Sequence, residues 1–140
     1  MKLANSYPGM LQELKDGFEN RYRRKDVNIT GILFARPESR FATAEILPHI
    51  DYWHHRSDNY TDFFCPGYFS KNVYGDTQPI LTVGGDPWFF SNYALSEFLE
   101  KLEKQTTWRY SGGCELLVTN TRFRRESINL IDTQMKASLA

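Results

Sequence analysis

All three histidines of the chain lie in one polar segment, His49–Tyr68. An imidazole titrates near pH 6.5, so a histidine that is oriented by a carboxylate can act as a general acid or base. Within this segment His54, His55 and Asp58 lie close enough in sequence for such chemistry, and we take them as candidate catalytic residues. Arg56 lies among them and would bind an anionic group of a substrate.

A metal site in the same segment is the first alternative. His54 and Asp58 would share one face of a helix, and an imidazole with a carboxylate suits zinc or manganese. The spacing matches no established ligand pattern, however, and the adjacent His54 and His55 cannot easily turn toward one ion. We therefore expect no metal ion, and no motif indicates a cofactor.

Nucleophilic catalysis is the second alternative. Ser57 or Cys65 could act beside a histidine, but neither lies in a nucleophile elbow or a Cys-His signature. Cys65 also lacks the second cysteine of a redox C-x-x-C motif, because Tyr68 occupies that position. We expect Cys65 and Cys114 to be reduced and mostly buried thiols.

Structure or partner binding is the third interpretation, and it is the favoured one. The segment is rich in aromatic residues, and rings with polar tips are typical of cores and of interfaces. The predicted binding residues are Trp53, Arg56, Ser57, Tyr60 and Tyr68, with Trp108 and Tyr110 beside them.

Binding to nucleic acid is considered because two short clusters combine basic and aromatic residues. Their basic members are Arg21, Arg23, Arg24, Arg122, Arg124 and Arg125. The chain has 17 Lys+Arg against 17 Asp+Glu, which argues against binding nucleic acid or an anionic membrane through bulk charge. We therefore expect a protein partner or self-association rather than nucleic acid.

The whole chain, residues 1–140, is predicted to form one domain, because its length is typical of one domain and no linker interrupts it. Its 15% aromatic content is that of a globular protein. No apolar run approaches the ~20 residues of a membrane span, and Met1–Gly9 lacks the apolar stretch of a signal peptide. We expect a cytoplasmic protein without a membrane partner.

Hydrophobic periodicity predicts the elements that would position these residues. Helices are expected from Ser6 to about Tyr22, over Phe41–Leu47 with Pro48 ending or kinking it, after Ser91 along Leu95–Leu102, and over the tail Thr121–Ala140. Strands are expected at Val27–Ala35, Phe63–Cys65, Gln78–Val83 and Cys114–Thr119, the last forming a hairpin or bulged strand with Trp108–Tyr110. In the tail, Ile128 and Leu130 also fit an edge strand.

This alternation predicts an α/β (α+β) domain with a single mixed sheet and helices packed on it. The inner βαββαβ section fits a ferredoxin-like order, with a thioredoxin-like order as the alternative.

Two stretches together are similar to a known group. They are Tyr52–Ser57 (YWHHRS) leading into Asp62–Tyr68 (DFFCPGY), and Trp108–Gly113 (WRYSGG) leading into Glu115–Val118 (ELLV). They resemble small uncharacterised bacterial α/β proteins with no established activity. The resemblance implies a bacterial cytosolic origin and carries no catalytic role.

From these observations we expect a binding or regulatory module, a subunit of a protein assembly that recognises its partner through His49–Tyr68. Neutral charge, high aromatic content and the lack of a known catalytic spacing favour this hypothesis. The alternative is a small hydrolase or nuclease for a phosphate-containing substrate, with His54 or His55 as the acid–base group and Arg56 as the anion clamp.

Overall fold

A computed structural model describes residues 2–4, 6–20, 27–57, 62–70, 79–124 and 127–138. Its main feature is a five-stranded mixed sheet in the order β1-β3-β2-β7-β8. The strands are β1 (Lys2–Ala4), β2 (Val27–Phe34), β3 (Asp62–Pro66), β7 (Glu115–Arg124) and β8 (Ser127–Ser138). The strands β1, β3 and β2 run parallel to one another, whereas β7 is antiparallel to both β2 and β8.

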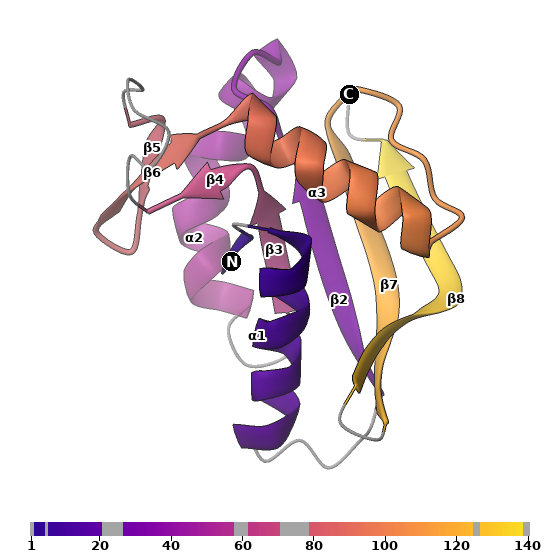
Figure 1. The fold of residues 1–140 in the computed structure, drawn as a ribbon. Helices are drawn as coiled ribbons and strands as arrows, with labels where there is room; N and C mark the ends of the chain where they lie inside the picture. The colour runs from indigo at the N-terminus through magenta and orange to yellow at the C-terminus, as the bar shows by residue number, and fades with distance from the viewer. Residues whose placement is uncertain are drawn as a thin grey trace.

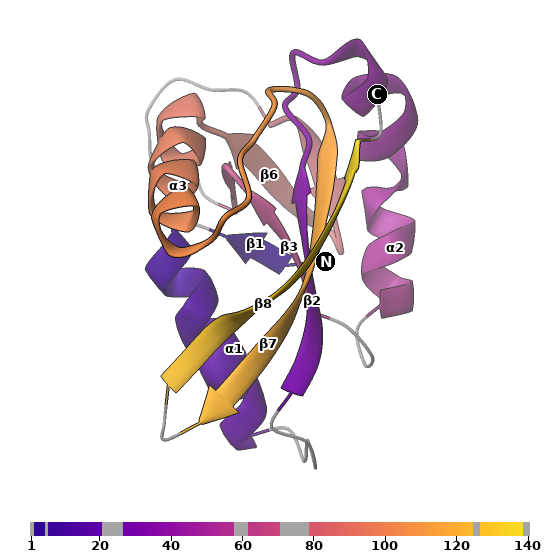
Figure 2. The ribbon, with the colours of Figure 1, turned by 90° about the vertical axis from the view of Figure 1, so that its right-hand side faces the viewer.

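Helices cover both faces of this sheet (Figure 1). They are α1 (Tyr7–Asn20), the π-helical turn η1 (Ala42–Ile46), the 3₁₀ turn η2 (Leu47–His49), α2 (Ile50–Ser57) and α3 (Asn92–Gln105). The edge-on view in Figure 2 shows α1 and α3 on one face and α2 on the other. The helix α1 connects β1 to β2 across one face of the sheet, and α2 connects β2 to β3 across the other. Such helical crossovers between parallel strands are typical of α/β proteins.

A second, smaller sheet lies beside the first. Its three antiparallel strands, in the order β4-β6-β5, are β4 (Tyr68–Phe69), β5 (Leu81–Val83) and β6 (Asp86–Phe90). In the turn between β5 and β6, Gly84 has a φ angle of 58° and Gly85 one of 87°. Residues other than glycine rarely adopt these backbone conformations. Because β4 follows β3 after Gly67 alone, this sheet continues the chain directly from the main sheet.

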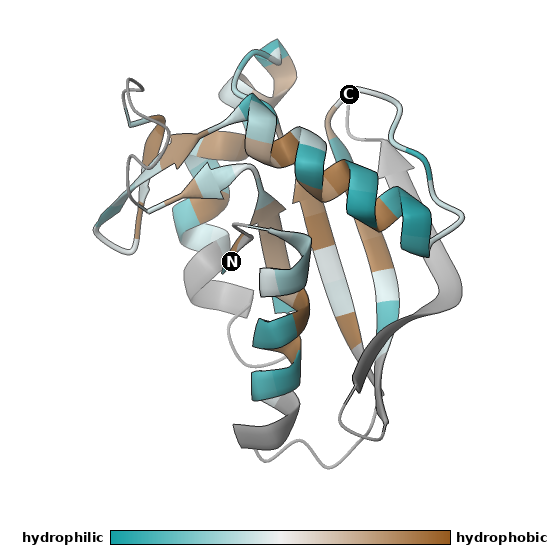
Figure 3. Cartoon of the chain, viewed as in Figure 1, coloured by the Kyte–Doolittle hydropathy of each residue, from teal (hydrophilic) through white to brown (hydrophobic). Residues whose placement is uncertain are grey.

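The core forms between α1, α3 and the main sheet. The α3 stripe of Leu95, Phe98 and Leu102 is buried, and the Phe98 ring meets Phe34 of β2 edge-on, with 6.2 Å between ring centroids. Ser91 caps this helix by accepting a hydrogen bond from the Ala94 amide. Figure 3 shows polar positions alternating with the apolar ones along α3, as the sequence pattern predicts.

The expected α+β class, with a mixed sheet and packed helices, is confirmed. The expectation of a single sheet is wrong, because β4, β5 and β6 form a second sheet. The strand predicted at Gln78–Val83 therefore lies outside the main sheet, and the βαββαβ section does not form one ferredoxin-like sheet. The helices α1 and α3 and the strand β2 lie where the periodicity placed them. Pro48 does not end the second helical segment. It lies in the first positions of the 3₁₀ turn η2, where its missing N–H costs no hydrogen bond, and the chain continues as α2.

The C-terminal helix prediction is wrong. Residues 121–124 continue β7, and β8 forms the edge strand that Ile128 and Leu130 also fit. Residues 127–138 form a strand because they pair with β7. Such a long-range pairing leaves no signal in the local hydrophobic periodicity. Residues 108–110 form no strand, so the expected hairpin with Cys114–Thr119 is wrong as well. The strands β1, β4 and β6 were not predicted from the sequence.

Among the helices in the described ranges, none has the length and apolar character that crossing a membrane requires.

Candidate functional site

The candidate catalytic residues lie at the end of α2 and beyond it. The backbone of His54 and His55 lies in this helix, but their side chains are outside the described part of the structure. The whole of Asp58 is outside it as well. Their geometry therefore tests neither the acid–base hypothesis nor the metal hypothesis. The candidate catalytic group remains a prediction.

The predicted binding residues of the same segment divide in the same way. The side chains of Arg56 and Ser57 and the whole of Tyr60 lie outside the described residues. Trp53 is described: its half-buried ring packs against the core and lies 6.0 Å, between centroids, from the ring of the exposed His49.

The first turns of α2 bring an aromatic side chain to the surface. Ile50 at the start of the helix is fully buried, which fixes the helix against the core. Tyr52 points the other way and is 58% exposed. It is one of only four large hydrophobic side chains that are exposed among the described residues.

A hydrogen bond holds the neighbouring β5–β6 turn against α2. The amide of Gly84 donates to Oδ1 of Asp51 at 2.7 Å. The strand β5 packs against α2, and Ile80, directly before this strand, is a second exposed large hydrophobic at 41%. We call Asp51, Tyr52, Trp53 and Ile80 the α2–β5 surface. Ile80 was missed by the sequence analysis, because an isoleucine that enters a strand has no local signal of exposure.

Tyr68 lies in the core and not on a recognition surface. Its side chain is fully buried between Trp88 and Phe90, with ring centroids 5.8 and 4.9 Å away. Its hydroxyl donates to the Ala35 carbonyl at 2.5 Å. Burial raises the pKa of this phenol far above its ordinary value. Tyr68 can support the fold at the end of β3, but it cannot contact a partner.

Trp108 is buried in the same way, at 6% exposure, and stacks on Phe34 with 4.9 Å between ring centroids. Tyr110 follows it and is half-buried. Burial raises the pKa of Tyr110, and Arg36 partly offsets this effect. These two predicted binding residues lie at the carboxyl end of β2, away from the α2–β5 surface.

The carboxyl ends of parallel strands are common ligand sites, so the groups at this edge are of interest. The Arg36 guanidinium lies 5.7 Å from the Tyr110 ring centroid, and its Nη1 is 3.5 Å from Oδ1 of Asn92. Asn92 in turn donates through Nδ2 to Oε1 of Glu38 at 2.9 Å. Asn92 thus contacts both the guanidinium of Arg36 and the carboxylate of Glu38.

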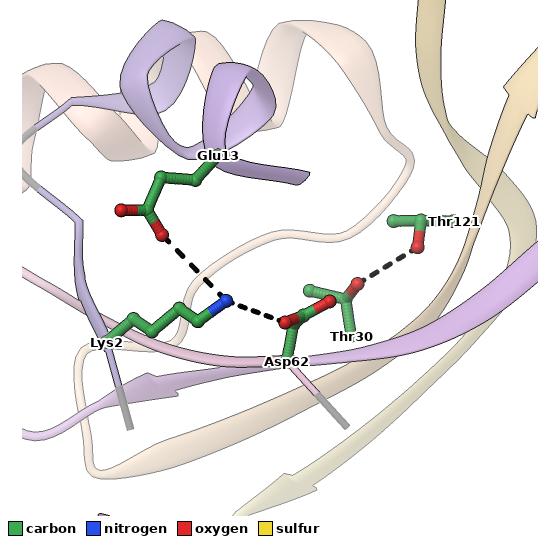
Figure 4. Close-up of polar contacts among 5 residues, drawn as sticks. All are labelled: Lys2, Glu13, Thr30, Asp62 and Thr121. Atoms are coloured by element: carbon green, nitrogen blue, oxygen red, sulfur yellow. Dashed lines mark hydrogen bonds and ion pairs between the residues drawn. The ribbon is translucent and has the colours of Figure 1, made fainter. Parts of the chain in front are cut away.

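A row of polar side chains crosses the other end of the sheet beneath α1 (Figure 4). Nζ of Lys2 in β1 lies 2.8 Å from Oδ1 of Asp62 in β3, and 3.9 Å from the carboxylate of Glu13 in α1. The hydroxyls of Thr30 and Thr121 are 3.0 Å apart and buried. The Asp62 side chain is 4% exposed, so this ion pair joins β1 to β3 inside the fold. Asp62 lies in the predicted segment His49–Tyr68, whereas the sequence pattern did not single out Lys2, Glu13, Thr30 or Thr121.

Both cysteines are unpaired and buried, as predicted. Burial raises the pKa of the Cys65 thiol, and the nearby Cys114 raises it further. The pKa of Cys114 is also raised by burial, with Glu115 adding to the effect. A thiol that stays protonated is a poor nucleophile, so the described geometry supports a structural role for both.

The basic clusters fall largely outside the description. Arg21, Arg23, Arg24 and Arg125 are not among the described residues, and for Arg122 and Arg124 only the backbone, in β7, is described. Within the described ranges, no three histidine, cysteine, aspartate or glutamate side chains are grouped so as to hold a metal ion.

Comparisons with known proteins do not assign the chain to a family. No family model matches the chain, and neither a curated protein nor a solved structure matches it.

Proposed function

We propose that the chain is a cytoplasmic binding or regulatory module of a bacterial protein assembly. Its His49–Tyr68 segment engages a protein partner through the α2–β5 surface. The observation that carries the proposal is the exposure of Tyr52, at 58%, on a helix whose first residue, Ile50, is fully buried in the core.

The chemistry of this surface supports a protein partner. Tyrosine is enriched at the energetic centres of protein interfaces, where its ring buries apolar area and its hydroxyl finds a polar partner. Ile80 adds apolar area on the segment beside α2, and the exposed Asp51 adds a charge. A mixed aromatic, aliphatic and acidic patch of this kind is suited to a partner with an apolar pocket and a basic rim.

The hydrogen bond between Gly84 and Asp51 supports the same function through its effect on entropy. It joins the β5–β6 turn to α2, so the two parts of the surface are already positioned before a partner arrives. Surfaces that are ordered in advance lose less conformational entropy on binding. Such preorganisation is expected of a recognition surface.

The test is affinity capture with the purified, tagged protein and with Tyr52→Ala and Ile80→Ser variants. The matched control is Tyr93→Ala, which removes an equally exposed tyrosine, at 62%, from α3 on the opposite face of the sheet. Proteins that wild type and Tyr93→Ala both enrich should be lost with Tyr52→Ala. Truncating a central tyrosine costs about 2 kcal/mol, or roughly 30-fold in affinity.

Circular dichroism must show that each variant is folded. Equal capture by wild type and by a folded Tyr52→Ala, Ile80→Ser double variant would overturn the proposal. Loss of capture with Tyr93→Ala alone would move the recognition surface to α3.

A further inference from the structure

The connections that leave β1 and β2 pass over opposite faces of the main sheet. The chain leaves β1 through α1 on one face, and it leaves β2 through α2 on the other. In α/β proteins such a change of face marks the place where ligands bind, at the carboxyl ends of the strands. The groups just beyond the carboxyl ends of β2 and β3 therefore lie where a ligand is expected.

Arg36 is a cation at this end of the sheet. It is half-buried just beyond β2, and its guanidinium lies against Tyr110, 5.7 Å from the ring centroid. Its Nε is buried and has no hydrogen-bond partner in the described part of the chain, and its Nη1 makes one long contact, 3.5 Å, with Oδ1 of Asn92. The ion pairs among the described residues do not include it. A guanidinium has five N–H donors that match the oxygens of a phosphate, and the acceptors among the described residues do not use them all.

The helix α3 begins at the same place. The amide of Ser91 donates to the carbonyl of Gly67 at 2.9 Å, so the helix starts beside the end of β3. The Ser91 hydroxyl accepts from the amide of Ala94, which leaves the Asn92 amide without an acceptor inside the helix. The start of a helix carries partial positive charge and binds phosphate groups through such amides. Because Arg36 contacts Asn92, the guanidinium and the start of α3 lie together.

We propose that the carboxyl end of β2 and the start of α3 form a binding site for a ligand that carries a phosphate group. The Arg36 guanidinium donates to two of the phosphate oxygens, and the Asn92 amide donates to a third. The ring of Tyr110 holds the guanidinium in place from one side. The proposal rests on the buried Nε of Arg36 and on the helix start that this side chain reaches, and it does not depend on the α2–β5 surface.

Glu38 offers a second way to test the site, because its carboxylate lies beside the same helix start. Oε1 of this exposed residue accepts a hydrogen bond from Nδ2 of Asn92 at 2.9 Å. A bound phosphate meets this negative charge, which lowers its affinity. Glu38→Gln should therefore strengthen phosphate binding, whereas Arg36→Gln should weaken it.

The test is an NMR titration of the full, isotope-labelled chain with inorganic phosphate at constant ionic strength. The signals of the Arg36 Nε–H and of the Asn92 amide should shift and saturate. Arg36→Gln should raise the phosphate dissociation constant about tenfold or more, and Glu38→Gln should lower it about threefold. Lys101→Gln removes the same charge as Arg36→Gln from an exposed position later in α3, and should leave the dissociation constant unchanged.

Wild-type signals of Arg36 and Asn92 that do not saturate up to about 50 mM phosphate overturn the proposal. A folded Arg36→Gln that binds as tightly as wild type, or a Glu38→Gln that binds no more tightly, overturns it as well. If Arg36→Gln fails to fold, Arg36→Lys replaces it, because lysine keeps the charge but loses the paired donors. That variant should bind phosphate severalfold more weakly than wild type, and equal affinity would contradict the site.

Discussion

The hydroxyl of Tyr68 donates a hydrogen bond to the carbonyl of Ala35. The two residues lie just beyond the ends of the neighbouring parallel strands β2 and β3. Ala35 follows β2, and Tyr68 begins β4, with only Gly67 between it and the end of β3. Both are buried, so this bond satisfies a carbonyl group that water cannot reach. The phenol thereby joins the end of the main sheet to the smaller sheet.

Tyr68→Phe should therefore destabilise the fold while keeping the ring packing. The variant leaves the Ala35 carbonyl buried without its donor, which costs about 1–3 kcal/mol. Urea denaturation followed by fluorescence measures the loss. Affinity capture by the folded variant should equal that of wild type, because Tyr68 does not reach the surface. A variant as stable as wild type would show that the carbonyl finds another donor.

Alkaline pH should lower the free energy of unfolding. The Cys65 and Cys114 thiols have an ordinary pKa of 9.0, and the fold raises both pKa values. The folded chain therefore keeps these protons at pH values where the unfolded chain releases them. The stability from this source is complete below about pH 8 and falls as the pH rises through 9 and beyond, by up to about 1.4 kcal/mol per pH unit for a fully buried thiol such as Cys65.

Denaturation at several pH values from about 7 to about 10 checks this slope. Cys65→Ala lowers stability at every pH because it leaves a cavity, but its stability should fall less steeply with pH. Parallel curves for the variant and wild type would assign the alkaline loss to other groups.

The ion pair between Lys2 and Asp62 should stabilise the docking of β1. Asp62→Asn removes the charge that faces Lys2 at 2.8 Å in a nearly buried position, and should cost about 2 kcal/mol. Glu13→Gln is the matched control, because its carboxylate is 3.9 Å from the same ammonium and 54% exposed. It should cost less than about 0.5 kcal/mol. Equal losses in thermal or urea denaturation would contradict this ranking.

Two glycines should respond to alanine in opposite directions. A Cβ on Gly31 would lie 2.4 Å from the Phe63 ring, so Gly31→Ala should cost about 1–3 kcal/mol through overpacking. A Cβ on Gly17 in α1 meets no atom within 4 Å, so Gly17→Ala should stabilise by about 0.5–1 kcal/mol. Denaturation midpoints measure both. A neutral Gly31→Ala would mean that the Phe63 ring can move aside.

The parts of the fold that follow from local pattern could be predicted. Leu95, Phe98 and Leu102 recur at helical spacing after a serine cap, and α3 lies there. The β-branched and apolar run at Val27–Phe34 was likewise sufficient to predict β2. The strand order was not predictable, because it depends on pairings between distant segments such as Val27 with Arg122.

The errors have a common physical cause. β8 was given as a helix and β6 was missed because each is stabilised mainly by its partner strand. The amide of Ile80 donates to the Trp88 carbonyl across β5 and β6, an interaction that no local pattern indicates. Tyr68 was assigned to the binding site for the same reason: the rings that bury it, Trp88 and Phe90, belong to the strand that was missed.

The order of the main sheet has a consequence for synthesis on the ribosome. The central strand β2 has β3 and β7 as neighbours, and β7 begins only at Glu115. Until that part of the chain has emerged, the edge of β2 that pairs with β7 has no partner strand. The strand β1 likewise cannot pair until β3 has been made. Native pairing therefore completes late, after most of the chain has been made, and chaperones that bind extended apolar segments have the longest access to β2.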